Sequence, residues 1–263
     1  MDFENIEFEI SEGVATLTLN RPKSLNSFTA QMHAEIRVAM QQVVEDPSIR
    51  CLVITGAGRG FCAGQDLGDR ASAGDGDVVD VGKSVEENYN PLIHSIMGLP
   101  KPVICAVNGV AAGAGASIAL ACDIVLAARS ASFIQVFCKI GLIPDSGGTW
   151  NLPRAVGLAR AKGLAMLGDR LVAETAESWG LIWKCVDDEH LQEETQKMAR
   201  HFATQPTRAL GRIKKLLQES GTNTLAEQLV LEQQAMQELG RSDDYREGVA
   251  AFLEKRTPRF KGV

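Results

Sequence analysis

The sequence has few of the residues that mark metal, redox or secreted proteins. Its six cysteines include no Cys-x-x-Cys pair, and its four histidines have no spacing typical of a zinc site. Cysteines in apolar, strand-like surroundings are typical of small buried side chains in a reducing compartment. No activating neighbour is visible for a reactive thiolate. We therefore expect no metal site and no catalytic cysteine.

Excess positive charge and long apolar runs are also missing. The chain has 27 basic and 33 acidic residues, a net charge of −6, which argues against a nucleic-acid or membrane-surface partner. No run approaches the roughly 20 apolar residues of a membrane span. The acidic segment 1–7 lacks the apolar centre of a signal peptide. We expect a cytoplasmic protein.

The composition that is present favours one large domain, or a main domain with an appendage. The chain has 263 residues, of which 45% are hydrophobic, enough for a packed core. Strand and helix patterns alternate up to about residue 190, and only helical patterns follow, which predicts an α/β core with a helical C-terminal section. The predicted strands are 6–10, 14–19, 51–55, 101–104, 122–128, 132–136 and 182–186. The predicted helices follow Thr29, cover 84–97, open near Gly113, start after 141–149, and then cover 190–203, 207–218, 223–239 and 243–255.

Two segments have no regular pattern. Residues 61–67 are neither helical nor strand-like, and residues 68–83 have the composition of a loop. A long loop of this kind is more often functional or disordered than structural filler.

A glycine- and alanine-rich stretch, from Cys105 to Asp123, follows an apolar strand. Small residues let a ligand approach the backbone, and the first N–H groups of a helix lack intrahelical acceptors. Such N–H groups favour an anion, or an oxygen that becomes anionic during a reaction. A helix packed closely against a sheet would explain the same composition, so both interpretations stay open. The stretch is neither a dinucleotide fingerprint nor a P-loop, because the third glycine and the Gly-Lys-Ser/Thr ending are missing.

Three irregular segments, 56–67, 108–115 and 141–149, each follow a strand, where α/β folds bind ligands. In their order and spacing they resemble the crotonase (enoyl-CoA hydratase/isomerase) superfamily over essentially the full length. The matching segments are 18–27, 60–67, 101–109, 122–124 and 141–149. The resemblance implies a crotonase-like spiral of strand–strand–helix (ββα) turns with a helical C-terminal trimerisation region. We expect a core over residues 1–200 and an oligomerisation and active-site-covering region over 201–263.

Exposed apolar residues in the final helices also favour self-association, as a homotrimer or a dimer of trimers. The resemblance further implies an acyl-CoA substrate whose thioester oxygen accepts hydrogen bonds from the backbone N–H groups of Gln65 and Ala114. No cofactor is implied, because coenzyme A is part of the substrate. Further substrate contacts are expected from Lys23, Ala63, Gly64, Asp66, Leu67 and Gly113. Candidates for the coenzyme A phosphates are Lys23, Arg21, Lys255, Arg256, Arg259 and Lys261, although solvated surface charge explains each equally well.

The acidic residues distinguish this chain from the hydratases of the superfamily. Those enzymes carry two glutamates at the positions of Ser117 and Phe137, and neither residue can move a proton as a carboxylate does. Asp145 stands where related isomerases and a dehalogenase have aspartate. Burial beside Phe137, Ile143 and Trp150 would raise the pKa of this carboxyl group, which favours a general base. The alternative is that Asp145 only caps a helix beginning at Ser146.

One carboxylate without a second acid favours double-bond migration, since one group can remove a proton and return it elsewhere. Segments 86–93, 139–150 and 244–256 resemble the phenylacetate-breakdown isomerases of the superfamily. This implies conversion of ring-1,2-epoxyphenylacetyl-CoA to oxepin-CoA and β,γ to α,β shifts in enoyl-CoA. The alternatives are dienoyl-CoA isomerisation, hydration, thioester hydrolysis, or a non-catalytic acyl-CoA binding protein.

Overall fold

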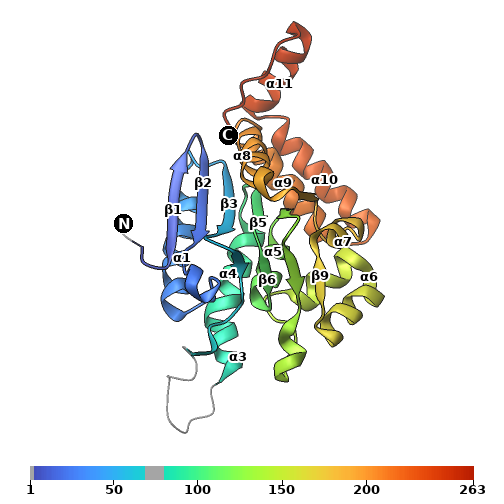
Figure 1. Ribbon diagram of the computed structural model, residues 1–263. Coiled ribbons are helices and arrows are strands. Elements are labelled where there is room, and N and C mark those ends of the chain that lie inside the picture. Colours follow the sequence, from blue (N-terminus) through green and yellow to red (C-terminus); the bar gives the residue numbers. More distant parts are fainter. Residues whose placement is uncertain (1–2, 69–79) are drawn as a thin grey trace.

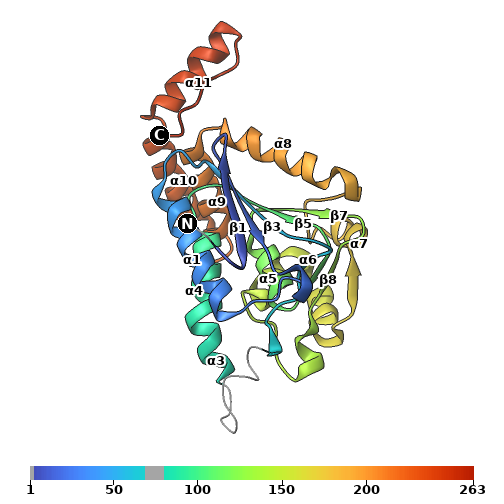
Figure 2. The same ribbon diagram turned by 60° about the vertical axis from the view of Figure 1, so that its left-hand side comes forward.

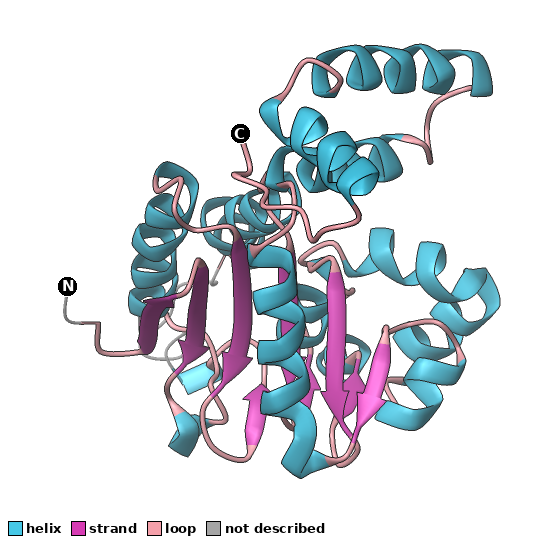
Figure 3. Cartoon of the chain, turned by 90° about the horizontal axis from the view of Figure 1, so that it is seen from above, coloured by secondary structure: helices cyan, strands magenta, loops and turns pink. Residues whose placement is uncertain are grey.

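The computed structural model describes residues 3–68 and 80–263. Its strands form a six-stranded sheet in the order β1-β2-β3-β5-β7-β10 and a four-stranded sheet in the order β4-β6-β8-β9. Helices lie around both sheets (Figure 3). The strands of the larger sheet are β1 (Ile6–Ser11), β2 (Val14–Leu19), β3 (Cys51–Gly56), β5 (Val103–Val107), β7 (Ile124–Ala128) and β10 (Lys184–Val186). Those of the smaller sheet are β4 (Gly60–Cys62), β6 (Val110–Ala112), β8 (Ser132–Ile134) and β9 (Arg170–Val172).

The N-terminal hairpin and the first long helix confirm the sequence prediction. Strands β1 and β2 pair antiparallel, and β2, β3, β5, β7 and β10 follow in parallel. Helix α1 (Ala30–Glu45) is capped by Thr29, whose side chain accepts a hydrogen bond from the Met32 N–H. Within the described ranges, further helices before the last strand include α3 (Val81–Ser84), α4 (Asn90–Gly98), α5 (Ala114–Ala121), α6 (Gly148–Leu167) and α7 (Ala173–Ser178), with a π-helical turn over Val85–Tyr89.

The predicted spiral of ββα turns is confirmed. Each of the pairs β3–β4, β5–β6 and β7–β8 places its first strand in the larger sheet and its second in the smaller one, and helices follow (Figure 1). Because β4 and β6 pair in parallel, the segments that leave their ends, 63–67 and 113–115, start side by side. The topology thus brings two of the three irregular segments together.

Several short elements were missed or wrongly bounded. Residues 60–62 form strand β4 although 61–67 was predicted irregular, and β6, β9 and α7 were not predicted. Strand β8 ends at Ile134 and a 3₁₀ helix, Val136–Ile140, follows. Helix α3 occupies the end of the predicted loop 68–83, while residues 69–79 lie outside the described residues. Elements of three or four residues are too short to show a hydrophobic period.

The four C-terminal helices agree with their predicted ranges: α8 (Leu191–Ala203), α9 (Thr207–Glu219), α10 (Leu225–Leu239) and α11 (Asp243–Glu254). The expected domain boundary at residue 200 falls inside α8, which packs on strands β2, β3, β5 and β7 of the larger sheet. Helix α11 projects away from the body, and the chain then turns back so that its C-terminus lies near the other helices (Figures 1 and 2). The Asp244 carboxylate holds this return by accepting the Lys261 and Gly262 N–H groups at 2.7 and 2.8 Å.

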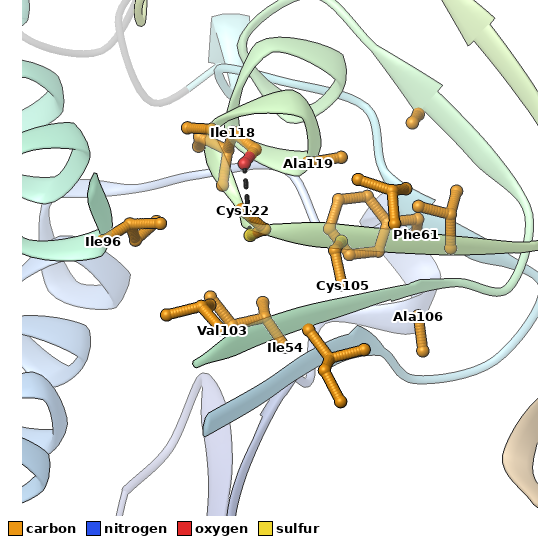
Figure 4. Packing of buried hydrophobic residues seen from close by; sticks show 14 of the residues in the cluster. Ile54, Phe61, Ile96, Val103, Cys105, Ala106, Ile118, Ala119 and Cys122 are labelled. Carbon is orange, nitrogen blue, oxygen red and sulfur yellow. Dashed lines mark hydrogen bonds between the residues drawn. The ribbon is translucent and has the colours of Figure 1, made fainter. Parts of the chain in front are cut away.

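The hydrophobic core joins both sheets to the helices that cover them. Figure 4 shows Cys105 and Cys122 among apolar neighbours such as Phe61 and Ile118. Four of the six cysteines are buried and all six are free thiols, as the sequence predicted. Burial raises the pKa of Cys62 to about 12, so this thiol is neutral near pH 7. Over the described ranges, no helix is both long and apolar enough to cross a bilayer.

Candidate active site

The segment after β4 is held beside residues 25–28 by backbone hydrogen bonds. The Phe28 N–H donates to the Gly64 carbonyl at 2.7 Å, and the Asp66 N–H donates to the Phe28 carbonyl at 2.9 Å. This bridge uses the N–H groups of Phe28 and Asp66 and leaves that of Gln65 outside it. Gly64 has a φ of +89°, a backbone conformation that glycine adopts without strain.

The Gln65 side chain also holds this segment in place. Its amide nitrogen donates to the Phe28 carbonyl at 3.0 Å, and its amide oxygen accepts the Tyr89 hydroxyl at 2.8 Å. Tyr89 ends the π-helical turn and is fully buried against the rings of Phe28 and His33. The sequence alone did not place Tyr89, because this contact joins residues far apart in the chain. Burial lowers the pKa of His33 to about 4, so its ring is neutral at pH 7.

Asp66 and Arg21 form an ion pair at 2.9 Å, and both side chains are about one-fifth exposed. The Arg21 guanidinium also donates to the Ser27 carbonyl, and the Ser27 hydroxyl donates to Asp66 at 3.2 Å. Arg21, expected near coenzyme A phosphates, therefore binds the 63–67 segment in this structure. The Asp66 carboxylate, which was expected to contact the substrate, belongs to the same network. Its contact with the substrate stays a prediction.

Asn26 supports this network and was missed as a functional residue. It is fully buried with a φ of +56°, and its side-chain nitrogen donates to the carbonyls of Ala57, Gly60 and Phe61. Its side-chain oxygen accepts the Arg21 N–H at 2.9 Å. Asparagine tolerates this left-handed backbone conformation better than most residues, which was a usable signal in the sequence.

The glycine-rich stretch opens helix α5 as predicted. Gly113 is the N-cap with a φ of +54°, and its N–H donates to the Ile134 carbonyl at 2.9 Å. Ala114 is the first helical residue, so its N–H has no intrahelical acceptor. A Cβ atom added to Gly64 would lie 3.3 Å from the Ala114 nitrogen. The Gly64–Gln65 peptide and the Ala114 N–H are therefore neighbours, and two such N–H groups can donate to one oxygen.

Asp145 lies in the turn before α6 and is half-buried. Its carboxylate accepts the hydroxyl of Ser146 at 3.0 Å. Helix α6 begins at Gly148, and its N-cap, Gly147, has no side-chain hydrogen bond. The helix therefore begins two residues after Ser146, and Asp145 is not its N-cap residue.

The apolar enclosure expected around Asp145 is only partly present. Phe137 is buried, but Ile143 is 76% exposed and Trp150 is 39% exposed. A turn has no regular period, so sequence neighbours do not reveal which way their side chains point. The Phe137 ring instead lies beside Gly113, with its tip 3.8 Å from the position of a Cβ atom on that glycine.

Ser117 connects the two parts of the site. It lies on α5 and is fully buried, and its hydroxyl oxygen is 2.7 Å from the position of a Cβ atom on Gly148. Helix α5 starts at Ala114, and helix α6 starts shortly after Asp145. The N-terminal ends of these two helices are therefore in contact. Where the hydratases have two glutamates, this chain has the hydroxyl of Ser117 and the aromatic ring of Phe137.

The remaining residues predicted to contact the substrate lie in three parts of the chain. Ala63, Gly64 and Gly113 belong to the two neighbouring segments, and Leu67 is 55% exposed at the end of the first. Lys23 is exposed in the 3₁₀ turn Pro22–Ser24. In the C-terminal tail, the Arg256 guanidinium donates to Glu247 at 2.6 Å and holds the pKa of that carboxyl at about 2. The phosphate contacts predicted for Lys255, Arg259 and Lys261 stay predictions.

A family model described as enoyl-CoA hydratase/isomerase matches residues 9–263, and the chain belongs to this family, within the crotonase superfamily. A 1,2-epoxyphenylacetyl-CoA isomerase of Escherichia coli (strain K12) is 59% identical over 98% of this chain and 99% of its own length. A trans-2-decenoyl-[acyl-carrier-protein] isomerase of Streptococcus mutans is 36% identical over 100% of both chains. The crystal structure of an enoyl-CoA hydratase from Bacillus anthracis matches with a TM-score of 0.93 at 34% identity, covering 99% of this chain and 100% of that one.

Proposed function

We propose that the protein is an acyl-CoA isomerase that converts ring-1,2-epoxyphenylacetyl-CoA to oxepin-CoA and moves β,γ double bonds of enoyl-CoA to the α,β position. The acidic residues of the site carry this proposal. Ser117 and Phe137 replace the glutamate pair of a hydratase, Asp66 is paired with Arg21, and Asp145 supplies a carboxylate beside the start of α6. The 59% identity to an isomerase named for the epoxide supports the same substrate.

In the proposed mechanism, the thioester oxygen accepts hydrogen bonds from the Gln65 and Ala114 N–H groups. These donors stabilise the enolate that forms when a proton leaves the α-carbon, and each is worth about 3–4 kcal/mol. Asp145 takes that proton and returns it to the γ-carbon of an enoyl chain, or to a ring carbon as the epoxide opens to the oxepin. The proton removed is the proton returned, so the product is an isomer of the substrate.

The test is an assay that separates isomerisation from the other reactions of the family. Purified protein is incubated with 3-hexenoyl-CoA or with freshly generated ring-1,2-epoxyphenylacetyl-CoA, and products are followed by absorbance and mass. We expect products of unchanged mass, with the 2-enoyl absorbance appearing in the first assay. A product heavier by one water, released free coenzyme A, or binding without turnover would contradict the proposal.

We also propose that the protein assembles as a trimer or a dimer of trimers. Helix α11 projects from the body (Figure 2). Residues of α9, α10 and α11 line a largely apolar groove there. Phe252 and Leu253 on this helix are 83% and 73% exposed, more than a lone chain normally leaves in water. Leu158, Met166 and Trp183 are exposed as well.

Replacing Phe252 with aspartate tests this assembly. In sedimentation velocity at micromolar concentration, we expect the wild type to sediment as three or six copies and Phe252→Asp to shift to smaller species, because a charge would be buried in the contact. Lys215→Asp, on the exposed side of α9, serves as the control for an added charge. A monomeric wild type would contradict the assembly.

A further inference from the structure

The two proposed N–H donors come from separate elements, so something must fix their spacing. Gln65 follows strand β4, and Ala114 opens helix α5. A shift of about 1 Å at a reacting group can lower a rate about a hundredfold, so both donors must be held firmly to act on one oxygen. The contact of Gly64 with Ala114 explains part of this, since the two segments touch there.

Cys62 contacts both donor segments. It is the last residue of β4, fully buried, and its Sγ atom accepts the Gly64 N–H at 3.3 Å. A Cβ atom added to Gly115 would lie 2.4 Å from the Cys62 carbonyl oxygen and 2.8 Å from its Sγ atom. Gly64 precedes Gln65 and Gly115 follows Ala114, so one side chain lies directly against the neighbours of both donors.

The chemistry of a thiol suits this position. A sulfur atom is large enough to reach the Gly64 N–H and weak enough as a polar group to be buried beside α5 at little cost. The Cys62 thiol is neutral at physiological pH, because burial raises its pKa to about 12. It is therefore not a nucleophile near neutral pH, and its contacts indicate a role in geometry.

We propose that Cys62 is a positioning residue that sets the distance between the two main-chain donors, through its sulfur contact with the Gly64 N–H and its packing under Gly115. This inference rests on the proposed function, because it assumes that Gln65 and Ala114 act on the thioester oxygen. Cys62 itself touches neither the substrate nor the reacting atoms in this proposal.

The test compares Cys62→Ala with Cys51→Ala. Cys51 is equally buried but lies in β3 of the larger sheet, so its replacement removes the same atom away from both donor segments. We expect Cys62→Ala to lower kcat about 10- to 100-fold while KM and coenzyme A affinity change less than about twofold. Cys51→Ala should keep kcat within about twofold of the wild type. Cys62→Ser, which retains an acceptor, should recover part of the loss and covers the case in which the alanine variant does not fold.

A spectroscopic measurement separates positioning from a loss of stability. Infrared spectra of carbonyl-labelled phenylacetyl-CoA bound to each protein report the polarisation of the thioester. We expect the carbonyl frequency to fall on binding to the wild type and Cys51→Ala, and to fall less on binding to Cys62→Ala. A full shift and normal kcat in Cys62→Ala would overturn the role of Cys62 alone. A carbonyl frequency that does not change on binding to the wild type would instead contradict the proposed role of the Gln65 and Ala114 N–H groups, and this inference with it.

Discussion

Asp145→Asn is expected to lower turnover of 3-enoyl-CoA by about a thousandfold or more, because a positioned general base contributes 10²–10⁴ and no second acid replaces it in the proposed mechanism. The amide keeps the size of the carboxylate and an oxygen that can accept the Ser146 hydroxyl, which Asp145 accepts at 3.0 Å. Folding should therefore be preserved. Initial rates of double-bond migration provide the measurement, and calorimetric titration with phenylacetyl-CoA should give nearly unchanged affinity.

Asp169→Asn is the matched control for this substitution. Asp169 is also an aspartate outside the helices and strands, directly before β9, but its side chain is 71% exposed and its ion-pair partner, Lys139, is 3.8 Å away. We expect this variant to turn over substrate at the wild-type rate. Turnover that survives in Asp145→Asn would rule out Asp145 as the group that carries the proton, and the reaction would then need another base.

Gly64→Ala is expected to lower kcat/KM at least a hundredfold. A methyl group at Gly64 would lie 3.0 Å from the Ala112 carbonyl and 3.3 Å from the Ala114 nitrogen. It would push the two donor segments apart and partly cover the Ala114 N–H. The φ of +89° adds strain of about 1–2 kcal/mol for any residue with a Cβ atom. Steady-state kinetics and thermal unfolding of the same preparation measure both effects.

Gly157→Ala separates the strain from the displacement. Gly157 has a φ of +76°, but an added Cβ atom there would have nothing within 4 Å. Gly157→Ala should lose only the stability that the strain costs and keep its activity, while Gly64→Ala should lose activity and the further stability that the displacement costs. Equal activity losses in both would show that backbone strain, rather than the spacing of the donor segments, explains the effect.

The long periodic elements of the fold were predictable from the sequence, and the short ones were not. The helices between Leu191 and Glu254 repeat apolar residues over three or more turns, so their ranges agree closely with the structure. Strands β4 and β6 have three residues each, yet their pairing brings the donor segments together. This pairing joins segments far apart in the sequence, so the local sequence pattern does not predict it.

The candidate site was predicted by resemblance more than by physical pattern. The glycine run suggested an anion site or close packing with equal weight, and the family resemblance singled out Gln65, Ala114 and Asp145. Cys62 and Tyr89 were missed, because their importance comes from hydrogen bonds to Gly64 and Gln65 that only the folded chain shows. The expected shielding of Asp145 failed at Ile143 and Trp150 because the direction of side chains in a turn is not periodic.

The proposed use of peptide N–H groups at Gln65 and Ala114 has an evolutionary consequence. Every amino acid except proline carries this group. Point mutations at either position therefore keep the two proposed hydrogen-bond donors as long as the backbone conformation is unchanged. Residues lining the acyl pocket are then free to diverge toward new substrates without loss of thioester activation. Because Ala114 is buried, laboratory evolution of this scaffold should tolerate other small side chains at position 114 but reject Ala114→Pro, which has no N–H group.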